Sequence, residues 1–366
     1  MRKVLIVKYD MSHQGGSERI AVNLGRELSA DFDVTIISMQ LEKPQIAFSL
    51  DSRIRFKSFE KGHHRLGVLY FLLATKHLKE IRSAQYDGVI CLGFETVLFP
   101  RLLANRARCK VLFSEQNMLC NNCLQTKKVL FLRKYAVEKS DYVILLSEDD
   151  LKEYTILFPK HINKMKVIYN WVEENLFNNT SALIYDKTSK KIMTVARISP
   201  MKNYEDIIRV ATIIKRNHPD WHWDLYGFEE EEYGKKIRTM IKQNSLDDFL
   251  SLKGHVDDIY ERYSSYSFLV HTAKTEPFGL AFIEAQVKGL PIIAYEGYGA
   301  MKEIISDENN GYLVPCGDYK EMARKVEQLI TDDNKRVEMS KCSKNNLYKF
   351  EKSKIINEWK SMLGNS

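Results

Sequence analysis

The sequence predicts an α/β protein of two domains, each a parallel sheet covered by helices on both faces. Short apolar runs alternate with amphipathic segments of helical period along the chain. A polar segment at 171–190 interrupts this alternation once, after which it starts again. The length of 366 residues is enough for two ordinary domains. We therefore expect two Rossmann-like domains joined by a linker.

Before the linker, buried strands are predicted wherever a short apolar run stands between turn residues, at 3–10, 33–40, 86–93, 109–116 and 141–148. Helices are predicted between them by apolar residues spaced three and four apart, at 16–30, 67–84 and 124–139. No run is long enough to cross a membrane, since the longest, "LGVLYFLLA", is about half a span. With no signal peptide recognisable at the start, we expect a cytoplasmic protein.

After the linker, the same criteria predict strands at 191–198, 223–228, 249–256, 268–274 and 291–296. Helices are predicted at 204–218, 233–244, 257–266, after Pro277, and through the end of the chain from about 318. Pro277 is expected in the first turn of its helix, because its fixed φ suits that position. Two such domains place a ligand in the cleft between them, where the carboxyl ends of both sheets face each other.

Charge and cysteine content narrow the classes of protein. Residues 1–170 hold 27 Lys and Arg against 18 Asp and Glu, whereas the remainder is slightly acidic. A basic first half predicts an acidic partner: nucleic acid, anionic lipid or a phosphorylated substrate. No basic and aromatic groove motif supports nucleic acid. The six scattered cysteines predict reduced thiols, and the pair Cys120 and Cys123 lacks the further ligands that a zinc site needs.

Several polar residues follow predicted strands, at the edge where ligands bind. Gly15 and Gly16 open the first helix, where backbone can approach an anion, although an ordinary strand-to-helix turn explains them equally. Arg197 and Lys202 follow the first strand of the second domain and suit a diphosphate, the alternative being solvated loop charges. The remaining candidates at this edge are weaker signals: Gly227, His255 and Val256.

The stretch "TEPFGLAFIEAQVKG" carries two acids, Glu276 and Glu284, around a predicted helix start. A capping acid and a solvated acid would be an ordinary explanation. Alternatively, both face a ligand rich in hydroxyl groups, such as a sugar and a ribose, while the amides at Phe278, Gly279 and Leu280 meet phosphate.

These motifs together resemble glycosyltransferase family 4, whose members are retaining enzymes of the GT-B fold. The resemblance rests on the glycine pair, on R-x(4)-K from Arg197 to Lys202, on E-x(7)-E from Glu276 to Glu284, and on "VIYNWV" at 167–172. It covers essentially the whole chain. It implies a domain at 1–170 that binds the acceptor, a linker at 171–190 and a nucleotide-sugar domain at 191–348. The helix at about 349–366 would pack back on the first domain.

The resemblance also implies roles for individual residues. Arg197 and Lys202 would bind the donor diphosphate and stabilise the leaving group, and Glu276 would contact hydroxyls of the transferred sugar. Glu284 would hold the ribose hydroxyls, and the base would lie near His255 and Val256. The backbone amides of residues 278–280 would bind the phosphates or the sugar. Gly16 would allow the first domain to close over the diphosphate. Gln116 stands where the family often has a histidine near the donor sugar. A glutamine cannot carry charge at neutral pH. Three explanations are open: catalysis tolerates a glutamine at this position, Glu115 shares the role of the histidine, or the alignment with the family is shifted by one residue.

The expected function is retaining transfer of a hexose or N-acetylhexosamine from a nucleotide sugar, with UDP the nucleotide that family usage favours. No cofactor or metal is expected, because fixed cations would neutralise the leaving diphosphate. The expected acceptor is a saccharide linked to a lipid, used for cell-surface polysaccharide or glycolipid synthesis. The basic, apolar segments 63–82 and 124–139 predict contact with the inner face of an anionic membrane, unless they are buried helices with a solvated face. A non-catalytic partner subunit and a nucleotide-sugar 2-epimerase remain alternatives.

Overall fold

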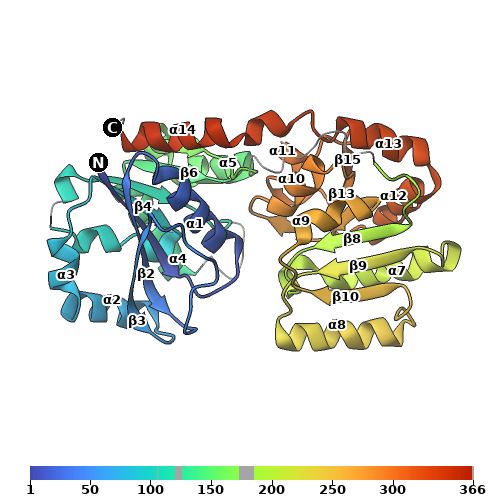
Figure 1. The fold of residues 1–366 in the computed structure, drawn as a ribbon, viewed down its shortest axis with the longest axis horizontal. Helices are drawn as coiled ribbons and strands as arrows, with labels where there is room; N and C mark the ends of the chain where they lie inside the picture. The colour runs from blue at the N-terminus through green and yellow to red at the C-terminus, as the bar shows by residue number, and fades with distance from the viewer. Residues whose placement is uncertain (105, 120–125, 173–184, 365–366) are drawn as a thin grey trace. The chain divides into compact units, whose positions relative to one another are not determined.

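The computed structural model describes residues 1–104, 106–119, 126–172 and 185–364. Within these ranges the chain divides into two compact units (Figure 1). Unit 1 contains Met1–Asn170 together with the chain from Ser353 onward, and unit 2 contains Trp171–Lys352. Most of the predicted linker, 173–184, lies outside the described residues, as does the pair Cys120 and Cys123.

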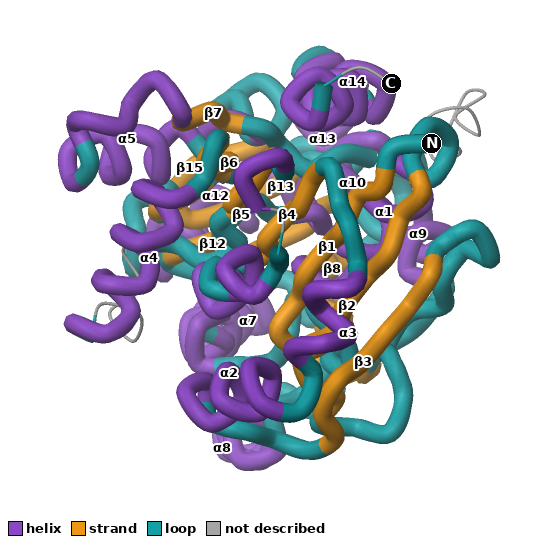
Figure 2. The backbone as a smooth tube through the Cα atoms, turned by 90° about the vertical axis from the view of Figure 1, so that its left-hand side faces the viewer, coloured by secondary structure: helices purple, strands orange, loops and turns teal. Residues whose placement is uncertain are grey.

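Unit 1 is built on a seven-stranded sheet in the order β3-β2-β1-β4-β5-β6-β7, and every pair of neighbours is parallel. Figure 2 shows β3, β2 and β1 lying side by side. The strand order reverses between β1 and β4, which makes their carboxyl ends the switch point of this sheet. The strands are β1 (Lys3–Asp10), β2 (Asp33–Leu41), β3 (Arg55–Lys61), β4 (Gly88–Leu92), β5 (Lys110–Ser114), β6 (Tyr142–Leu145) and β7 (Met165–Val167).

The central strands of this sheet are continuous apolar runs because helices cover both of its faces. Residues Val4 to Val7 of β1 are fully buried, and β4 is buried along its whole length. The edge strand β3, "RFKSFEK", is half-buried and charged. The apolar-run criterion did not predict β3 or the three-residue strand β7. The helices are α1 (Gly16–Leu28), α2 (Leu66–Thr75), α3 (Leu78–Ser83), α4 (Lys127–Lys139) and α5 (Glu148–Leu157).

The single helix predicted at 67–84 is wrong, because the structure divides it into α2 and α3. The first helix ends at Thr75, and His77 directly precedes the second. The His77 ring lies against Phe59 of β3, with ring centroids 4.9 Å apart, and its Nε2 lies 2.9 Å from the Glu60 carboxylate. A contact with a distant strand thus stops the helix at a point where the local sequence alone would continue it.

Unit 2 contains a six-stranded parallel sheet in the order β10-β9-β8-β11-β13-β15 and a two-stranded sheet of β12 and β14. The strands are β8 (Lys191–Val195), β9 (His222–Tyr226), β10 (Leu250–Gly254), β11 (Phe268–His271), β12 (Thr275–Glu276), β13 (Ile292–Tyr295), β14 (Tyr298–Gly299) and β15 (Gly311–Val314). The helices are α7 (Tyr204–Asn217), α8 (Glu231–Gln243), α9 (Ile259–Arg262), α10 (Leu280–Val287), α11 (Met301–Ile304), α12 (Tyr319–Thr331) and α13 (Asp333–Cys342). The short strands β12, β14 and β15 were not predicted.

The last helix, α14 (Lys352–Leu363), packs on unit 1. Leu363 lies directly over Gly88 at the start of β4, where a side chain on Gly88 would collide with it. The Arg2 guanidinium donates a hydrogen bond of 2.6 Å to the carbonyl of Gly364, and Lys360 pairs with Asp31. The final segment of the described chain therefore completes the amino-terminal edge of the first sheet.

Candidate active site

The two charged residues Lys202 and Glu276 meet in unit 2. Lys202 ends a short 3-10 turn, Pro200–Lys202, that follows β8, and Glu276 lies in β12 just beyond the end of β11. The Lys202 Nζ lies 2.5 Å from the Glu276 Oε2, and the two side chains are 18% and 14% exposed. The sequence places them 74 residues apart, and the parallel sheet brings them to one carboxyl edge.

Hydrogen bonds to the end of β11 fix the position of Lys202. The Thr272 hydroxyl lies 3.0 Å from the carbonyl oxygens of both Lys202 and Asn203. Asn203 itself has a φ of 53°, a left-handed conformation that asparagine tolerates better than most residues. Its amide group donates to Asp206, the second acid in the first turn of α7. The turn is thereby held to both the next helix and the neighbouring strand.

His271 completes this charged group, and the sequence analysis did not single it out. It is the last residue of β11, and its Nε2 lies 3.3 Å from the Glu276 Oε2. Its ring is 2% exposed and stands edge-on against Phe282. Neither ring nitrogen has a well-directed hydrogen bond within the described residues. A polar residue ending an otherwise apolar strand, "FLVH", is the signal that could have identified it.

The environment sets the charge states of this group. Burial raises the pKa of Glu276, but the Lys202 ammonium and the His271 ring outweigh it and lower the pKa to about 2. Burial lowers the pKa of His271 below its ordinary value, despite the nearby Glu276 carboxylate. At neutral pH the group therefore consists of an ammonium, a carboxylate and a neutral imidazole.

Arg197 lies on the same loop as Lys202 but is exposed, and its side chain has no partner within the described residues. The loop is held against β9 at Gly227, whose φ is 148°. A Cβ on Gly227 would lie 1.9 Å from the Ala196 carbonyl oxygen. Gly227 is thus required for backbone packing beside the Arg197 loop, which is a sufficient reason for a glycine there.

The predicted position of Pro277 in a first helical turn is wrong, because α10 begins three residues later at Leu280. Gly279 precedes the helix with a φ of 87°, a conformation that favours glycine. The backbone amides of Gly279 and Leu280 have no acceptor within the described residues, and they stand three and four residues beyond Glu276. Phe278 is buried against Phe350. This helix start can receive an anion beside the Lys202 and Glu276 pair.

Glu284 lies one turn inside α10 and is 4% exposed. Its two carboxylate oxygens accept hydrogen bonds from the hydroxyls of Tyr260, at 3.0 Å, and Tyr263, at 3.1 Å. Glu284 is therefore a positioned acid rather than a solvated one. The tyrosines come from the segment after β10, which also carries His255 and Val256.

His255 and Val256 follow β10 directly. The exposed His255 ring stacks on Phe228, with centroids 4.1 Å apart and planes within 20°. Phe228 follows Gly227 at the end of β9 and is 37% exposed. The stacked pair forms an aromatic surface at the carboxyl edge of the second sheet, and the sequence analysis had not included Phe228.

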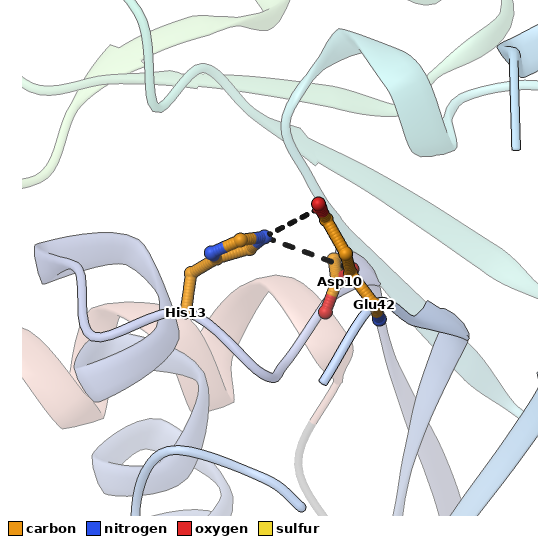
Figure 3. A group of neighbouring side chains, drawn as sticks. All are labelled: Asp10, His13 and Glu42. Atoms are coloured by element: carbon orange, nitrogen blue, oxygen red, sulfur yellow. Dashed lines mark hydrogen bonds and ion pairs between the residues drawn. The ribbon is translucent and has the colours of Figure 1, made fainter. Parts of the chain in front are cut away.

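In unit 1, Gly15 caps α1 and Gly16 is its first residue, and neither has a positive φ. The preceding loop is tied to two strand ends through His13 (Figure 3). The His13 Nε2 lies 3.1 Å from the Glu42 carboxylate and 3.8 Å from that of Asp10. One ligand atom from each of the three residues lies within 4.8 Å of the others, so this group could hold a divalent cation. Without a cation, the His13 ring still lies within hydrogen-bond distance of the Glu42 carboxylate.

Gln116 follows β5 and donates a hydrogen bond of 2.8 Å to the Ser114 hydroxyl. Glu115 cannot share the role near the donor sugar that the resemblance gives to position 116, because the Glu115 side chain points into unit 1. Its carboxylate accepts hydrogen bonds from Arg133, at 2.8 Å, and from the Tyr154 hydroxyl, at 2.5 Å. This buried group links β5 to α4 and α5.

Unit 1 also has a hollow of about 370 Å³, in the segment that follows Glu42. It is lined by Leu41, Pro44, Gln45, Ile46, Ala47, Phe48, Ser49 and Phe56, none of which is a predicted site residue. Among the described helices, none combines the length and apolar character required to cross a bilayer.

Two units that each carry a parallel sheet covered by helices are the architecture of the GT-B class of proteins. The solved structure of HepE from Anabaena, in complex with UDP and glucose, superposes with a TM-score of 0.81 and 19% identity, and all of both chains is covered. This similarity confirms the predicted fold.

The sequence comparisons give the family. Residues 14–176 match Glycosyltransferase Family 4, and residues 178–346 match Glycosyl transferases group 1. A glycosyltransferase of Haemophilus influenzae is 26% identical over 367 residues, covering 99% of this chain and all of the relative. The amylovoran biosynthesis glycosyltransferase AmsD of Erwinia amylovora is 22% identical over 369 residues, with 99% and 100% covered. The chain belongs to the group 1 and family 4 glycosyltransferases.

Proposed function

We propose that this glycosyltransferase moves a hexose or N-acetylhexosamine from a UDP-sugar to a saccharide acceptor with retention of anomeric configuration. The observation that carries the proposal is the group of Lys202, Glu276 and His271 beside the start of α10. A cation, a carboxylate and backbone amides at one sheet edge suit a ligand that has both a diphosphate and sugar hydroxyls. The complex of HepE with UDP and glucose supports a donor of this kind.

The chemistry follows from where charge develops. Cleavage of the glycosyl–phosphate bond leaves negative charge on the diphosphate and positive charge on the anomeric carbon. Lys202, the exposed Arg197 and the amides of Gly279 and Leu280 would stabilise the leaving diphosphate. The Glu276 carboxylate would accept hydrogen bonds from sugar hydroxyls near the developing cation. We propose that these groups suffice and that no metal is needed at the diphosphate.

Retention requires the acceptor to attack from the face that the diphosphate leaves. The departing phosphate oxygen would take the proton of the attacking hydroxyl, so that no separate base is needed for this step. His271 would remain neutral and keep Glu276 oriented, because burial lowers the pKa of His271. Glu284, held by Tyr260 and Tyr263, would accept hydrogen bonds from the ribose, and the His255 and Phe228 pair would lie against the base.

The acceptor we propose is a lipid-linked saccharide, and the role we propose is in cell-surface polysaccharide synthesis. The name of the amylovoran biosynthesis relative supports a biosynthetic role of this kind. The helix α4 supports a membrane contact. Phe131 is 65% exposed and Leu130 36% exposed, and both lie between exposed lysines at 127, 128 and 134. Apolar side chains among basic ones bind the surface of an anionic bilayer. On α2, Val68 and Phe71 are exposed as well.

This membrane contact is tested by sedimentation with vesicles at low salt. Phe131→Ser should reduce binding to vesicles that contain anionic phospholipid, whereas Ile156→Ser, at an exposed position of α5, serves as the matched control. Equal binding of the two variants and the parent protein would exclude α4 as the contact.

The transferase activity is tested by screening UDP-sugars for thermal stabilisation and for release of UDP, with and without EDTA. One UDP-sugar should stabilise the protein and be turned over at the same rate in EDTA, and the anomeric coupling in the product should match that of the donor. An inverted product would refute retention. Binding without turnover would favour a partner subunit, for which Gln116 is the supporting residue. Conversion of the free UDP-sugar to an epimer would favour an epimerase.

A further inference from the structure

Asp206 is a buried acid at the start of α7 that the proposed mechanism leaves unused. It stands three residues after Asn203, the N-cap of the helix, and is 3% exposed. Its Oδ2 accepts hydrogen bonds from the Asn203 amide, at 2.6 Å, and the Tyr295 hydroxyl, at 2.8 Å. Its Oδ1 accepts one of 2.8 Å from Arg209. A buried carboxylate is costly unless it is hydrogen-bonded, and these three donors both satisfy it and fix its position.

Ordinary helix capping does not explain the contacts of Asp206. In a capping box, the acid at the third position of a helix accepts a hydrogen bond from the backbone amide of the N-cap. In α7 the backbone amide of Asn203 donates instead to the carbonyl of Pro200, at 3.2 Å, and the Asp206 carboxylate receives the Asn203 side chain. Asp206 therefore holds a side chain of the turn that precedes the helix.

Asn203 is held between Asp206 and the end of β11. Its side-chain amide also donates to the carbonyl of Thr272, at 3.3 Å. The Thr272 hydroxyl lies 3.0 Å from the carbonyl oxygens of both Lys202 and Asn203. Tyr295 reaches Asp206 from the end of β13, which is the neighbour of β11 in the sheet. One carboxylate thus joins α7 and two adjacent strands to the turn that ends in Lys202.

The turn needs such support because Lys202 directly precedes a residue in an unfavourable conformation. Asn203 has a φ of 53°, which residues other than glycine adopt only at some cost. The side chain of Lys202 is itself a flexible four-carbon stem. Its ammonium nonetheless lies 2.5 Å from the Glu276 carboxylate. Because Lys202 and Asn203 are adjacent, a change in the backbone at Asn203 would move this ammonium.

We propose that Asp206 is a positioning residue of the transferase, which keeps the Lys202 ammonium where negative charge develops on the leaving diphosphate. The proposal rests on the proposed function, in which Lys202 stabilises that charge. Asp206 acts through Asn203 and does not itself contact the nucleotide sugar, since its carboxylate is engaged by three side chains. A displacement of about 1 Å at a reacting centre can cost about a hundredfold in rate, so an acid outside the site can affect catalysis through geometry alone.

The test measures release of UDP from UDP-glucose or UDP-N-acetylglucosamine by the full chain. No acceptor is needed, because water can take the sugar and the leaving group is the same. Asp206→Asn keeps the shape of the side chain and removes its charge. It should lower kcat about tenfold, with little change in the KM for the UDP-sugar. Glu205→Gln is the matched control and should keep the kcat of the parent protein, because Glu205 lies in the same first turn but pairs with Lys236 of α8.

A double variant separates positioning from a structural role. If Asp206 acts through Lys202, then Asp206→Asn should cause no further loss of kcat when Lys202→Ala is already present. A merely structural role would lower kcat or stability by the same factor in both backgrounds. A further loss of about tenfold in the double variant, or a single variant with the kcat of the parent protein, would overturn the role of Asp206.

A second variant keeps the proposal testable if Asp206→Asn does not fold. Asn203→Gly retains the left-handed conformation at low cost and removes the amide that Asp206 holds. It should lower kcat by a similar factor, and an unchanged kcat would count against the positioning role. A parent protein that releases no UDP from any UDP-sugar would instead refute the proposed function, and the role of Asp206 with it.

Discussion

Removing the Lys202 ammonium tests the central charged group most directly. Lys202→Ala leaves Glu276 with its buried carboxylate and without its closest cation, which lies 2.5 Å away. The pKa of Glu276 is about 2 instead of 4.5. A difference of this size corresponds to about 3 kcal/mol of stability at neutral pH, and loss of Lys202 removes a large part of it. The variant should therefore unfold at lower denaturant concentration.

The same substitution should affect catalysis more than donor binding. Loss of one electrostatic group at a developing charge costs about 3 kcal/mol of transition-state stabilisation, or about a hundredfold in kcat. Single-turnover release of UDP measures this directly. The double variant Lys202→Ala with Glu276→Gln removes both charges, so it should recover stability without recovering activity.

Two results would refute this reasoning. A Lys202→Ala variant with a kcat within threefold of the parent protein would show that Lys202 does not stabilise the leaving group. A double variant as unstable as Lys202→Ala would show that the lost stability did not come from the buried Glu276 charge left without its cation. Lys202→Arg serves as the control, because it retains the positive charge with a different geometry.

Three further predictions concern other residues. The lowered pKa of Glu276 contributes stability that is complete above about pH 5 and is lost as the pH falls toward 2, so Glu276→Gln should flatten the stability profile in that window, as measured by urea unfolding. Gly227→Ala should cost more than 2 kcal/mol, because its Cβ would overlap the Ala196 carbonyl, whereas Gly317→Ala, with a similar need for positive φ and open space around it, should cost about 1 kcal/mol in the same assay. Glu284→Ala should weaken UDP binding about tenfold in calorimetry while Tyr263→Phe has a smaller effect, and equal affinities would exclude the ribose role.

Much of the fold could be predicted because parallel strands buried on both faces leave a clear pattern. Val4 to Val7 and the whole of β4 are apolar runs, and their strand identity follows from that pattern alone. β3 was not predicted because it is a charged edge strand without an apolar run, and it forms by pairing with β2. The break between α2 and α3 was not predicted either, because it depends on a contact between His77 and the strand β3, which is distant from it in the sequence.

The candidate site shows the same limit. Arg197, Lys202 and Glu276 were predicted because charged residues after strands are conspicuous, and the structure brings Lys202 and Glu276 into contact. His271 was missed because it belongs to the strand itself, and its meaning depends on a carboxylate five residues later that folds back beside it.

The division of the chain into units has a consequence for how the protein is made. Unit 2 is one continuous segment, whereas unit 1 needs residues from both sides of it. Leu363 and Gly364 close the edge of the first sheet at Gly88 and Arg2, yet the ribosome adds them after every residue of unit 2. We therefore expect the order of folding during synthesis to be reversed relative to the sequence. The sheet of unit 2 can reach its native state on the ribosome, whereas the sheet of unit 1 is complete only after the last helix has been synthesised.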